Sequence, residues 1–165
     1  MGDVRIRAWG APGDLGWVVL AHGELYAAEY GFGQVFERHV VRSVASLAEP
    51  GRQRGWIAEL DGRRVGSVIC APSTTATDVA QLRLLLVHPD ARGLGVGGQL
   101  VDTCIAFATA AGYRRLRLWT CDVLAAALAT YEKRGFREVG RAPYDGFGVR
   151  VIGLDYELDL AGSFG

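Results

Sequence analysis

Residues 87–100 read VHPDARGLGVGGQL and connect a predicted strand to a predicted helix. The residues QLRLLLV at 81–87 form a short apolar run that is typical of a strand. After the loop, apolar residues recur at helical spacing from Leu100 to Ala111, and Gly112 ends the pattern. A strand therefore runs into a glycine-rich loop, and this loop opens a helix.

The glycine-rich loop predicts a binding site for an anion. Glycine lets the backbone approach a ligand closely, and the first N–H groups of a helix have no partner inside the helix. These N–H groups and the helix dipole favour a phosphate or a pyrophosphate. Arg92 adds a positive charge at the mouth of the loop.

The loop has three interpretations. Residues 93–98, read as G-x-G-x-x-G, fit the fingerprint of dinucleotide-binding proteins, and Asp122 follows the next strand roughly where a ribose-binding acid belongs. That fingerprint requires its strand to enter the first glycine almost directly, whereas residues 88–92 intervene here. The favoured interpretation is R-x-x-G-x-G at 92–97, and a structural turn without a ligand is the third.

Composition predicts an ordinary globular protein. The 165 residues are half hydrophobic and hold 18 basic and 18 acidic side chains, so we expect a single domain over residues 1–165 and no affinity for nucleic acid or membrane. The first nine residues lack the apolar core of a signal peptide, so a cytoplasmic location is expected. The cysteines, Cys70, Cys104 and Cys121, form no C-x-x-C pair, and no cluster has metal-ligand spacing.

The order of predicted elements indicates an α/β fold with a mixed, mostly antiparallel sheet around a βαβ core. Asp14 is a plausible N-cap for residues 15–21, the motif Asp61-Gly62 predicts a hairpin, and Gly135 is placed to end a helix. The predicted strands cover Val4–Trp9, 55–60, 64–70, 79–87, 116–121, 136–141 and 149–158. One predicted helix has an apolar face from Val35 to Leu47. A second follows the glycine loop up to Gly112, and a third covers residues 124–134.

Two motifs resemble the GNAT superfamily of acetyl-CoA-dependent N-acetyltransferases. The acyl-CoA motif of that family is matched by Arg92–Gly97, and its later signature by the residues YEKRGF at 131–136. A helix, a strand and a second helix separate the two motifs, as in the family. More narrowly, HGELYAAEYG at 22–31 and FGVRVIGLDYEL at 147–158 resemble the acetyltransferase half of fused MarR-type regulators. The winged-helix half of those regulators is absent, so DNA binding is not carried over.

The resemblance implies roles for both motifs and a GNAT fold with an acyl-CoA-binding core. The pyrophosphate of acetyl-CoA would bind the amides of the loop beside Arg92. The backbone of Leu86 and Val87 would meet the pantetheine as a further strand, and the Val87 amide would polarise the thioester. Tyr131 would be the general acid that protonates the departing thiolate. The implied cofactor-binding residues are Leu86, Val87, Arg92, Gly93, Leu94, Gly95, Val96 and Gly97.

The chain departs from the family pattern at two places. Gln81 and Arg83 stand on the strand where many relatives carry a catalytic glutamate, so the base lies elsewhere or acts through water. Leu124 stands where the family often has asparagine, and that polar contact would then be missing or come from Thr120 or Asp122. The acidic candidates for the base are Glu24 and Glu29.

Aromatic residues and histidines supply candidates for the acceptor site, because family members build it from early helices and the last hairpin. These candidates are His22, Tyr26, Tyr30, Tyr144 and Phe147. His39 shares an apolar helix face and is expected to pack, whereas His88 is expected to be a solvated loop residue. No base partner is evident for Cys121 as a nucleophile.

The expected function is direct transfer of an acetyl group from acetyl-CoA to a primary amine of a small molecule, peptide or protein. A CoA-binding sensor or interaction module with little catalysis is the alternative, motivated by the missing glutamate and by Leu124. A dinucleotide-binding oxidoreductase rests on the G-x-G-x-x-G pattern alone. A homodimer is possible in such a fold because exposed sheet edges often pair.

Overall fold

The computed structural model describes residues 2–48 and 51–161, and the strands in these ranges form one seven-stranded sheet. The strands are β1 (Val4–Ala8), β2 (Arg54–Leu60), β3 (Arg63–Pro72), β4 (Val79–Val87), β5 (Arg115–Cys121), β6 (Arg137–Tyr144) and β7 (Val151–Asp159). Their order across the sheet is β1-β2-β3-β4-β5-β7-β6, and only β4 and β5 pair in parallel. The predicted mixed, mostly antiparallel sheet is confirmed.

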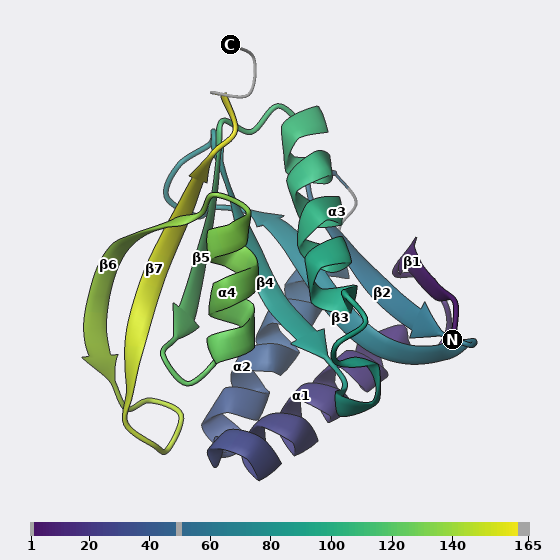
Figure 1. Cartoon of the computed structure of the whole chain (residues 1–165). Helices are drawn as coiled ribbons and strands as arrows, with labels where there is room; N and C mark the ends of the chain where they lie inside the picture. Colours follow the sequence, from purple (N-terminus) through teal and green to yellow (C-terminus); the bar gives the residue numbers. More distant parts are fainter. Residues whose placement is uncertain (1, 49–50, 162–165) are drawn as a thin grey trace.

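Helices cover both faces of the sheet (Figure 1). α1 (Asp14–Tyr30) and α2 (Gln34–Ala45) lie on one face, and α3 (Val96–Ala110) and α4 (Ala125–Lys133) lie on the other. Two short 3-10 turns, η1 (Ser46–Ala48) and η2 (Pro89–Ala91), complete the elements of the described ranges. Because α3 connects the parallel strands β4 and β5, the expected βαβ core is present. In the part of the chain that the structure describes, no helix is long and apolar enough to span a bilayer.

Strands β4 and β5 separate soon after they begin, which opens a V-shaped gap in the sheet (Figure 1). Their pairing runs only from Val79 opposite Arg115 to Gln81 opposite Arg117. Farther along, β4 carries an irregularity against β3, and Leu84 adopts the left-handed conformation with a φ of 53°. Such a bulge bends its strand, and a non-glycine residue at positive φ is strained unless its surroundings hold it.

Local sequence signals correctly predict the turns that frame the sheet. Asp61 and Gly62 have φ angles of 52° and 78°, as the predicted hairpin between β2 and β3 requires. Gly135 has a φ of 91° and follows the last turn of α4, where the Phe136 N–H donates to the carbonyl of Tyr131 at 3.2 Å. Gly135 therefore ends α4 as predicted.

One sequence-based expectation on the first helices is wrong, and a second holds in part. Asp14 is the first residue of α1 rather than its N-cap, which is Gly13, and the Asp14 carboxylate instead binds two arginines and two backbone N–H groups. His39 lies at the edge of the apolar face of α2, where its side chain is exposed on one side and its ring centre lies 5.9 Å from that of Phe147. The buried side chains of α2 are Phe36, Val40, Ser43 and Val44.

Candidate active site

The glycine loop has the geometry of an anion site. Gly93 and Gly95 have φ angles of 81° and 76°, and Gly95 caps α3. The Gln99 N–H makes the first hydrogen bond inside the helix, to the carbonyl of Gly95 at 3.1 Å, so the N–H groups of residues 96–98 precede the helical ladder. A Cβ on Gly93 or Gly95 would meet no atom within 4 Å, which leaves the inner side of the loop open to a ligand.

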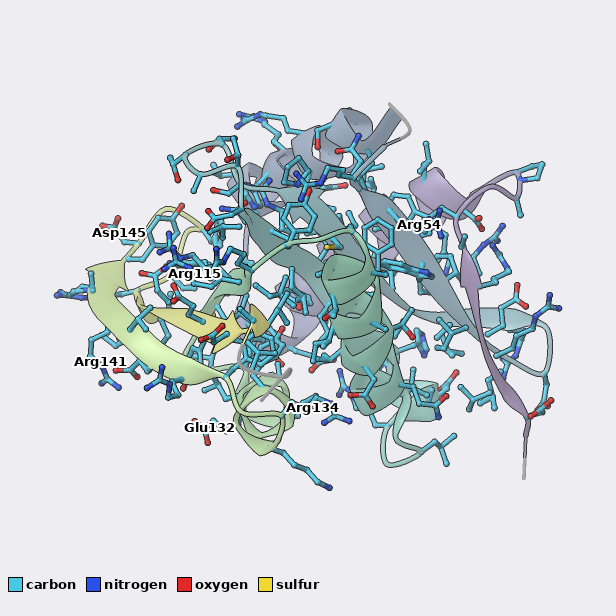
Figure 2. All side chains as sticks on the ribbon, turned by 90° about the horizontal axis from the view of Figure 1, so that it is seen from above. Arg54, Arg115, Glu132, Arg134, Arg141 and Asp145 are labelled. Carbon is cyan, nitrogen blue, oxygen red and sulfur yellow. The ribbon has the colours of Figure 1, made fainter. Side chains whose placement is uncertain are left out.

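Gly98 leaves room for the side chain of Arg134 between α3 and α4. A Cβ at this position would collide with the guanidinium of Arg134, which lies between the two helices (Figure 2). Arg134 is held there because its Nε donates to Oδ1 of Asp102 at 2.7 Å. A Cβ on Gly97 would lie 3.5 Å from the Val87 side chain, an ordinary van der Waals contact, so the first turn of α3 lies beside the end of β4.

A cavity of about 360 Å³ lies between the glycine loop, α1 and α4, and we call it the loop cavity. Seven of the eight predicted cofactor-binding residues line it, whereas Leu94 is 42% exposed on the outside of the loop. The cavity is lined by Leu25, Tyr26, Glu29, Tyr30, Leu85, Leu86, Val87, Ala91, Arg92, Gly93, Gly95, Val96, Gly97, Gly98, Leu124, Ala126, Ala127 and Thr130.

The two candidate bases, Glu24 and Glu29, have different surroundings. Glu29 lines the loop cavity, and its carboxylate forms an ion pair with the guanidinium of Arg92. Glu24 is exposed on α1 and lines neither this cavity nor the one described below. The structure therefore brings Glu29 to the loop cavity, where it pairs with Arg92, and does not bring Glu24 to either cavity.

The end of β4 presents a free edge to the loop cavity. The His88 N–H donates across to the carbonyl of Val65 on β3 at 2.7 Å. Because successive N–H groups of a strand point to alternate sides, the Val87 N–H points away from β3 and toward the gap left by β5. The backbone groups of Leu85 point to the same side as those of Val87, and the Leu85 carbonyl accepts a hydrogen bond from the Tyr26 hydroxyl at 3.3 Å.

A larger cavity, of about 500 Å³, fills the gap between β4 and β5 on the side of α1 and α2. It adjoins the loop cavity, because Tyr26, Leu85, Leu124 and Ala127 line both. Its lining residues are His22, Tyr26, Phe32, Phe36, His39, Gln81, Leu82, Arg83, Leu84, Leu85, Arg117, Leu118, Trp119, Thr120, Cys121, Leu124, Ala127, Tyr131, Tyr144, Phe147 and Asp155.

Tyr131 of α4 lies at the wall of the larger cavity, close to its junction with the loop cavity. Its neighbour one turn earlier, Ala127, lines both cavities. Tyr131 is only 4% exposed, and its ring packs on Phe136 with the ring centres 5.6 Å apart. Burial raises the pKa of the Tyr131 hydroxyl far above its ordinary value, and the neighbouring Tyr26 adds to the effect. The hydroxyl is therefore a proton donor throughout the physiological range.

His22 is buried behind the bulge of β4. Its Nδ1 lies 2.7 Å from the carbonyl of Val18, while Nε2 is buried and has no hydrogen-bond partner among the described residues. Burial lowers the pKa of His22 to about 4, although the backbone groups of Val18 and Leu84 oppose this shift. His22 is therefore neutral near pH 7, with Nδ1 donating to Val18 and a lone pair on Nε2.

The predicted acceptor residues do not all share one cavity. His22, Tyr144 and Phe147 line the larger cavity, and Tyr26 stands between the two cavities with its ring stacked on Phe36 at 4.8 Å. Tyr30 lines the loop cavity alone. The last turn of α1 thus lines the loop cavity, whereas the β6–β7 loop contributes to the larger cavity.

Thr120 and Asp122, which were considered as substitutes for the asparagine of the family, lie in different surroundings. Thr120 is buried in the wall of the larger cavity, whereas Oδ1 of Asp122 accepts from the Ile152 N–H at 3.0 Å and joins β5 to β7. Leu124 lines both cavities with an apolar side chain. Burial raises the pKa of the Cys121 thiol to about 11, so this cysteine is a poor nucleophile. Within the described residues, no group of three or more His, Cys, Asp or Glu side chains could hold a metal ion.

Sequence reasoning missed three charged residues of the larger cavity: Arg83, Arg117 and Asp155. The sequence pattern placed Arg83 only near the strand position where many relatives carry a glutamate. Arg83 and Arg117 come from strands that are distant in the sequence and parallel in the sheet, and Asp155 comes from the last strand. An alternation of arginine with apolar residues, as in residues 115–119, is the one signal that could have identified part of this set.

The chain matches one protein family over most of its length. The model of the acetyltransferase (GNAT) family matches residues 19–136. A curated relative, the probable N-acetyltransferase camello of Xenopus tropicalis, is 40% identical over 83 residues, which are 50% of this chain and 38% of that relative. The chain therefore spans less than two fifths of the length of that relative.

Solved structures share the fold over nearly the whole chain. The ribosomal-protein-S18-alanine N-acetyltransferase of Escherichia coli superimposes with a TM-score of 0.72 at 22% identity, covering 96% of this chain and 95% of that one. The structure of yncA from Salmonella typhimurium, with its cofactor acetyl-CoA, gives a TM-score of 0.73 at 17% identity, covering 96% and 94%. The resemblance to fused MarR-type regulators has no counterpart in these matches.

Proposed function

Because the chain belongs to the acetyltransferase (GNAT) family, we propose that it transfers an acetyl group from acetyl-CoA directly to a primary amine. The observation that carries this proposal is the junction of the two cavities. The loop cavity ends at the free edge of β4, and the larger cavity begins there, with Tyr131 in its wall. A donor and an acceptor bound in the two cavities would meet at this junction, beside a proton donor.

The loop cavity fits the cosubstrate. The N–H groups of residues 96–98 and the guanidinium of Arg92 would bind the pyrophosphate, since both prefer an anion. The edge of β4 beyond its pairing with β5 would hold the pantetheine as a further strand does. Acetyl-CoA supplies the acetyl group as a thioester. The Val87 N–H would donate to the thioester carbonyl and stabilise the negative charge that develops there.

The chemistry assigned to the chain is proton transfer and charge stabilisation. The Tyr131 hydroxyl would give its proton to the departing thiolate. Neither of the two candidate bases at the cavities suits the role, because Glu29 is paired with Arg92, and His22, with its pKa of about 4, is a weak base. We therefore propose that the amine reacts after losing its proton to solvent and binds as the free base.

Calorimetric titration with acetyl-CoA, with NAD as the control, tests the cofactor. Binding of acetyl-CoA and not NAD supports the proposal, and the reverse would revive the dinucleotide interpretation. That interpretation has little structural support, because η2 separates β4 from Gly93. Release of free thiol in the presence of amines then separates an enzyme from a CoA-binding sensor, which would bind acetyl-CoA without turnover.

Replacing Glu29 by glutamine should strengthen the binding of acetyl-CoA roughly two- to fivefold. The Glu29 carboxylate neutralises Arg92, and an exposed ion pair of this kind is worth up to about 1 kcal/mol. Glutamine keeps the shape and frees the guanidinium for the pyrophosphate. The measurement is calorimetry at low salt, and Glu24→Gln on the same helix is the matched control, expected to change nothing. Weaker binding by Glu29→Gln would show that the carboxylate itself helps to hold the cofactor.

The pH dependence of kcat/KM for the amine should show a single rising limb. If the amine binds as its free base, kcat/KM rises about tenfold per pH unit until the pKa of the amine is reached. Tyr131 adds no falling limb below about pH 10, because its pKa is raised above the ordinary value of 10.0 and the hydroxyl keeps its proton. Two amines with different pKa values should shift the limb accordingly. A limb that stays fixed for both amines would instead identify a base on the protein.

A further inference from the structure

The narrow end of the larger cavity holds an arginine without an acidic partner. The guanidinium of Arg83 donates from Nε and Nη2 to the amide oxygen of Gln81, at 2.9 and 2.5 Å. The ion pairs among the described residues do not include Arg83, although its side chain is partly buried in the cavity wall. A cation that is partly removed from water without a counter-charge is unfavourable, so this end of the cavity favours an anion.

The charged side chains around Arg83 leave a surplus of positive charge. Arg117 and Arg115 of β5 share the carboxylate of Glu157, with N–O distances of 2.7 and 3.5 Å. Asp155 lies on the same face of β7 as Glu157 and lines the cavity. Arg137 stands opposite Glu157 on β6, and Arg42 is close enough to His39 to lower its pKa, so basic side chains outnumber acidic ones here. His39 adds no charge near neutral pH, because burial, and then the nearby arginines, lowers its pKa. The surplus of positive charge suits a ligand that carries an anionic group.

The surplus of positive charge lies far from the proposed point of acetyl transfer. Gln81 is the last residue of β4 that pairs with β5, opposite Arg117, so these side chains mark the closed end of the V-shaped gap. Val87 lies at its open end, four residues beyond Arg83 along β4. At about 3.3 Å per residue, that separation is roughly 13 Å. Between the two ends, Phe36 and Leu118 give the cavity apolar walls.

Figure 2 shows that Arg115 and Asp145 lie on one side of strands β6 and β7, while Glu132 and Arg134 of α4 lie on the other. Arg117, two residues beyond Arg115 on β5, faces the same side as Arg115, because side chains alternate along a strand. The positive charge is therefore on the face of the sheet that carries α1 and α2, where the larger cavity opens, rather than on the α4 face.

We propose that the larger cavity selects an elongated acceptor, a primary amine that carries a carboxylate roughly 10 Å from its nitrogen. The carboxylate binds the guanidinium of Arg83, with Arg117 beside it, in the planar fork that arginine offers to carboxylates. The chain of the acceptor crosses the apolar middle of the cavity, and the amine reaches the junction beside Tyr131. This inference rests on the proposed function and names its substrate class.

The test compares matched acceptors in a thiol-release assay. One series consists of straight-chain ω-amino carboxylates from glycine to aminooctanoate, and the second of the corresponding amino alcohols. We expect the carboxylate to raise kcat/KM roughly ten- to a hundredfold at the longer lengths, through KM, and not at the length of glycine. The peptides Gly-Gly-Asp amide and Gly-Gly-Asn amide repeat the comparison and distinguish a peptide source of the carboxylate from a free small molecule.

Variants test whether Arg83 is the residue that makes the protein prefer acceptors with a carboxylate. Arg83→Met should bring the carboxylate-to-alcohol ratio close to one, Arg83→Lys should retain part of it, and Arg141→Met on β6, outside both cavities, should retain all of it. A ratio near one in the unaltered protein, with acetyl-CoA bound and amines acetylated, would overturn this inference alone. Absence of acetyl-CoA binding and of turnover with every amine would instead overturn the proposed function.

Discussion

Replacing Tyr131 by phenylalanine is expected to lower kcat roughly a hundred- to a thousandfold while leaving the affinity for acetyl-CoA nearly unchanged. The substitution removes the hydroxyl and keeps the ring, which is buried and packs on Phe136. Because burial keeps the hydroxyl protonated, Tyr131 can give a proton to a departing thiolate at any physiological pH. Phenylalanine cannot, and the thiolate would then leave without a proton donor beside it.

The measurement combines single-turnover kinetics with calorimetry and a thermal melt. Tyr113→Phe is the matched control, because Tyr113 is also buried and its hydroxyl donates to the carbonyl of Arg52 at 2.8 Å, outside both cavities. The control should lose some stability and keep its kcat. A Tyr131→Phe variant that folds, binds acetyl-CoA and turns over at nearly the original rate would show that the proton comes from another donor.

Much of the fold could be predicted because its signals are local. The period of apolar residues predicted β4 with its observed bounds, and glycines at fixed positions predicted the hairpin at Asp61-Gly62 and the end of α4. The glycine loop was predicted for the same reason, since its positive φ angles and its place before a helix are properties of a few consecutive residues.

The rest of the candidate site depends on contacts between distant segments. Nothing near Glu29 in the sequence indicates that its carboxylate meets Arg92, which lies 63 residues later. Likewise, the left-handed conformation of Leu84 is fixed by its partner strand, where the Ser67 hydroxyl donates to the Leu84 carbonyl at 3.2 Å. No local sequence motif encodes such pairs, because they form only when α1 and the strands have packed together.

Asp14 shows the same dependence, and it has the largest consequence for stability. Its carboxylate is 2% exposed and accepts hydrogen bonds from Arg7 of β1 at 2.8 Å and from Arg64 of β3 at 2.9 Å. The N–H groups of Gly10 and Ala11 donate to the same carboxylate. One side chain thus joins the start of α1 to two strands. The same helix carries Tyr26 and Glu29, which line the loop cavity.

Replacing Asp14 by alanine is therefore expected to destabilise the protein by about 3 kcal/mol or more, which corresponds to a fall in Tm of roughly 6 to 12 °C. The substitution leaves two arginines and two backbone N–H groups near the surface of the core without their common acceptor. Asp3→Ala, at an exposed position before β1, is the control and should change Tm by less than about 2 °C.

The Asp14 carboxylate is expected to make the stability of the protein fall in acid. Its hydrogen bond with Arg7 lowers the pKa of Asp14 well below the ordinary value of 3.8, against the opposing effect of burial. The folded state therefore binds this proton less readily than the unfolded state, and the stabilisation is complete above the ordinary pKa and is lost as the pH falls toward the folded value. Urea unfolding of the original protein and of Asp14→Asn should thus differ by a constant amount from pH 7 down to about pH 5, and the difference should shrink progressively as the pH falls below the ordinary pKa of 3.8 toward the folded value. Curves that stay parallel over this acid range would show that the ion pairs contribute no net stability and that Asp14 acts through shape alone.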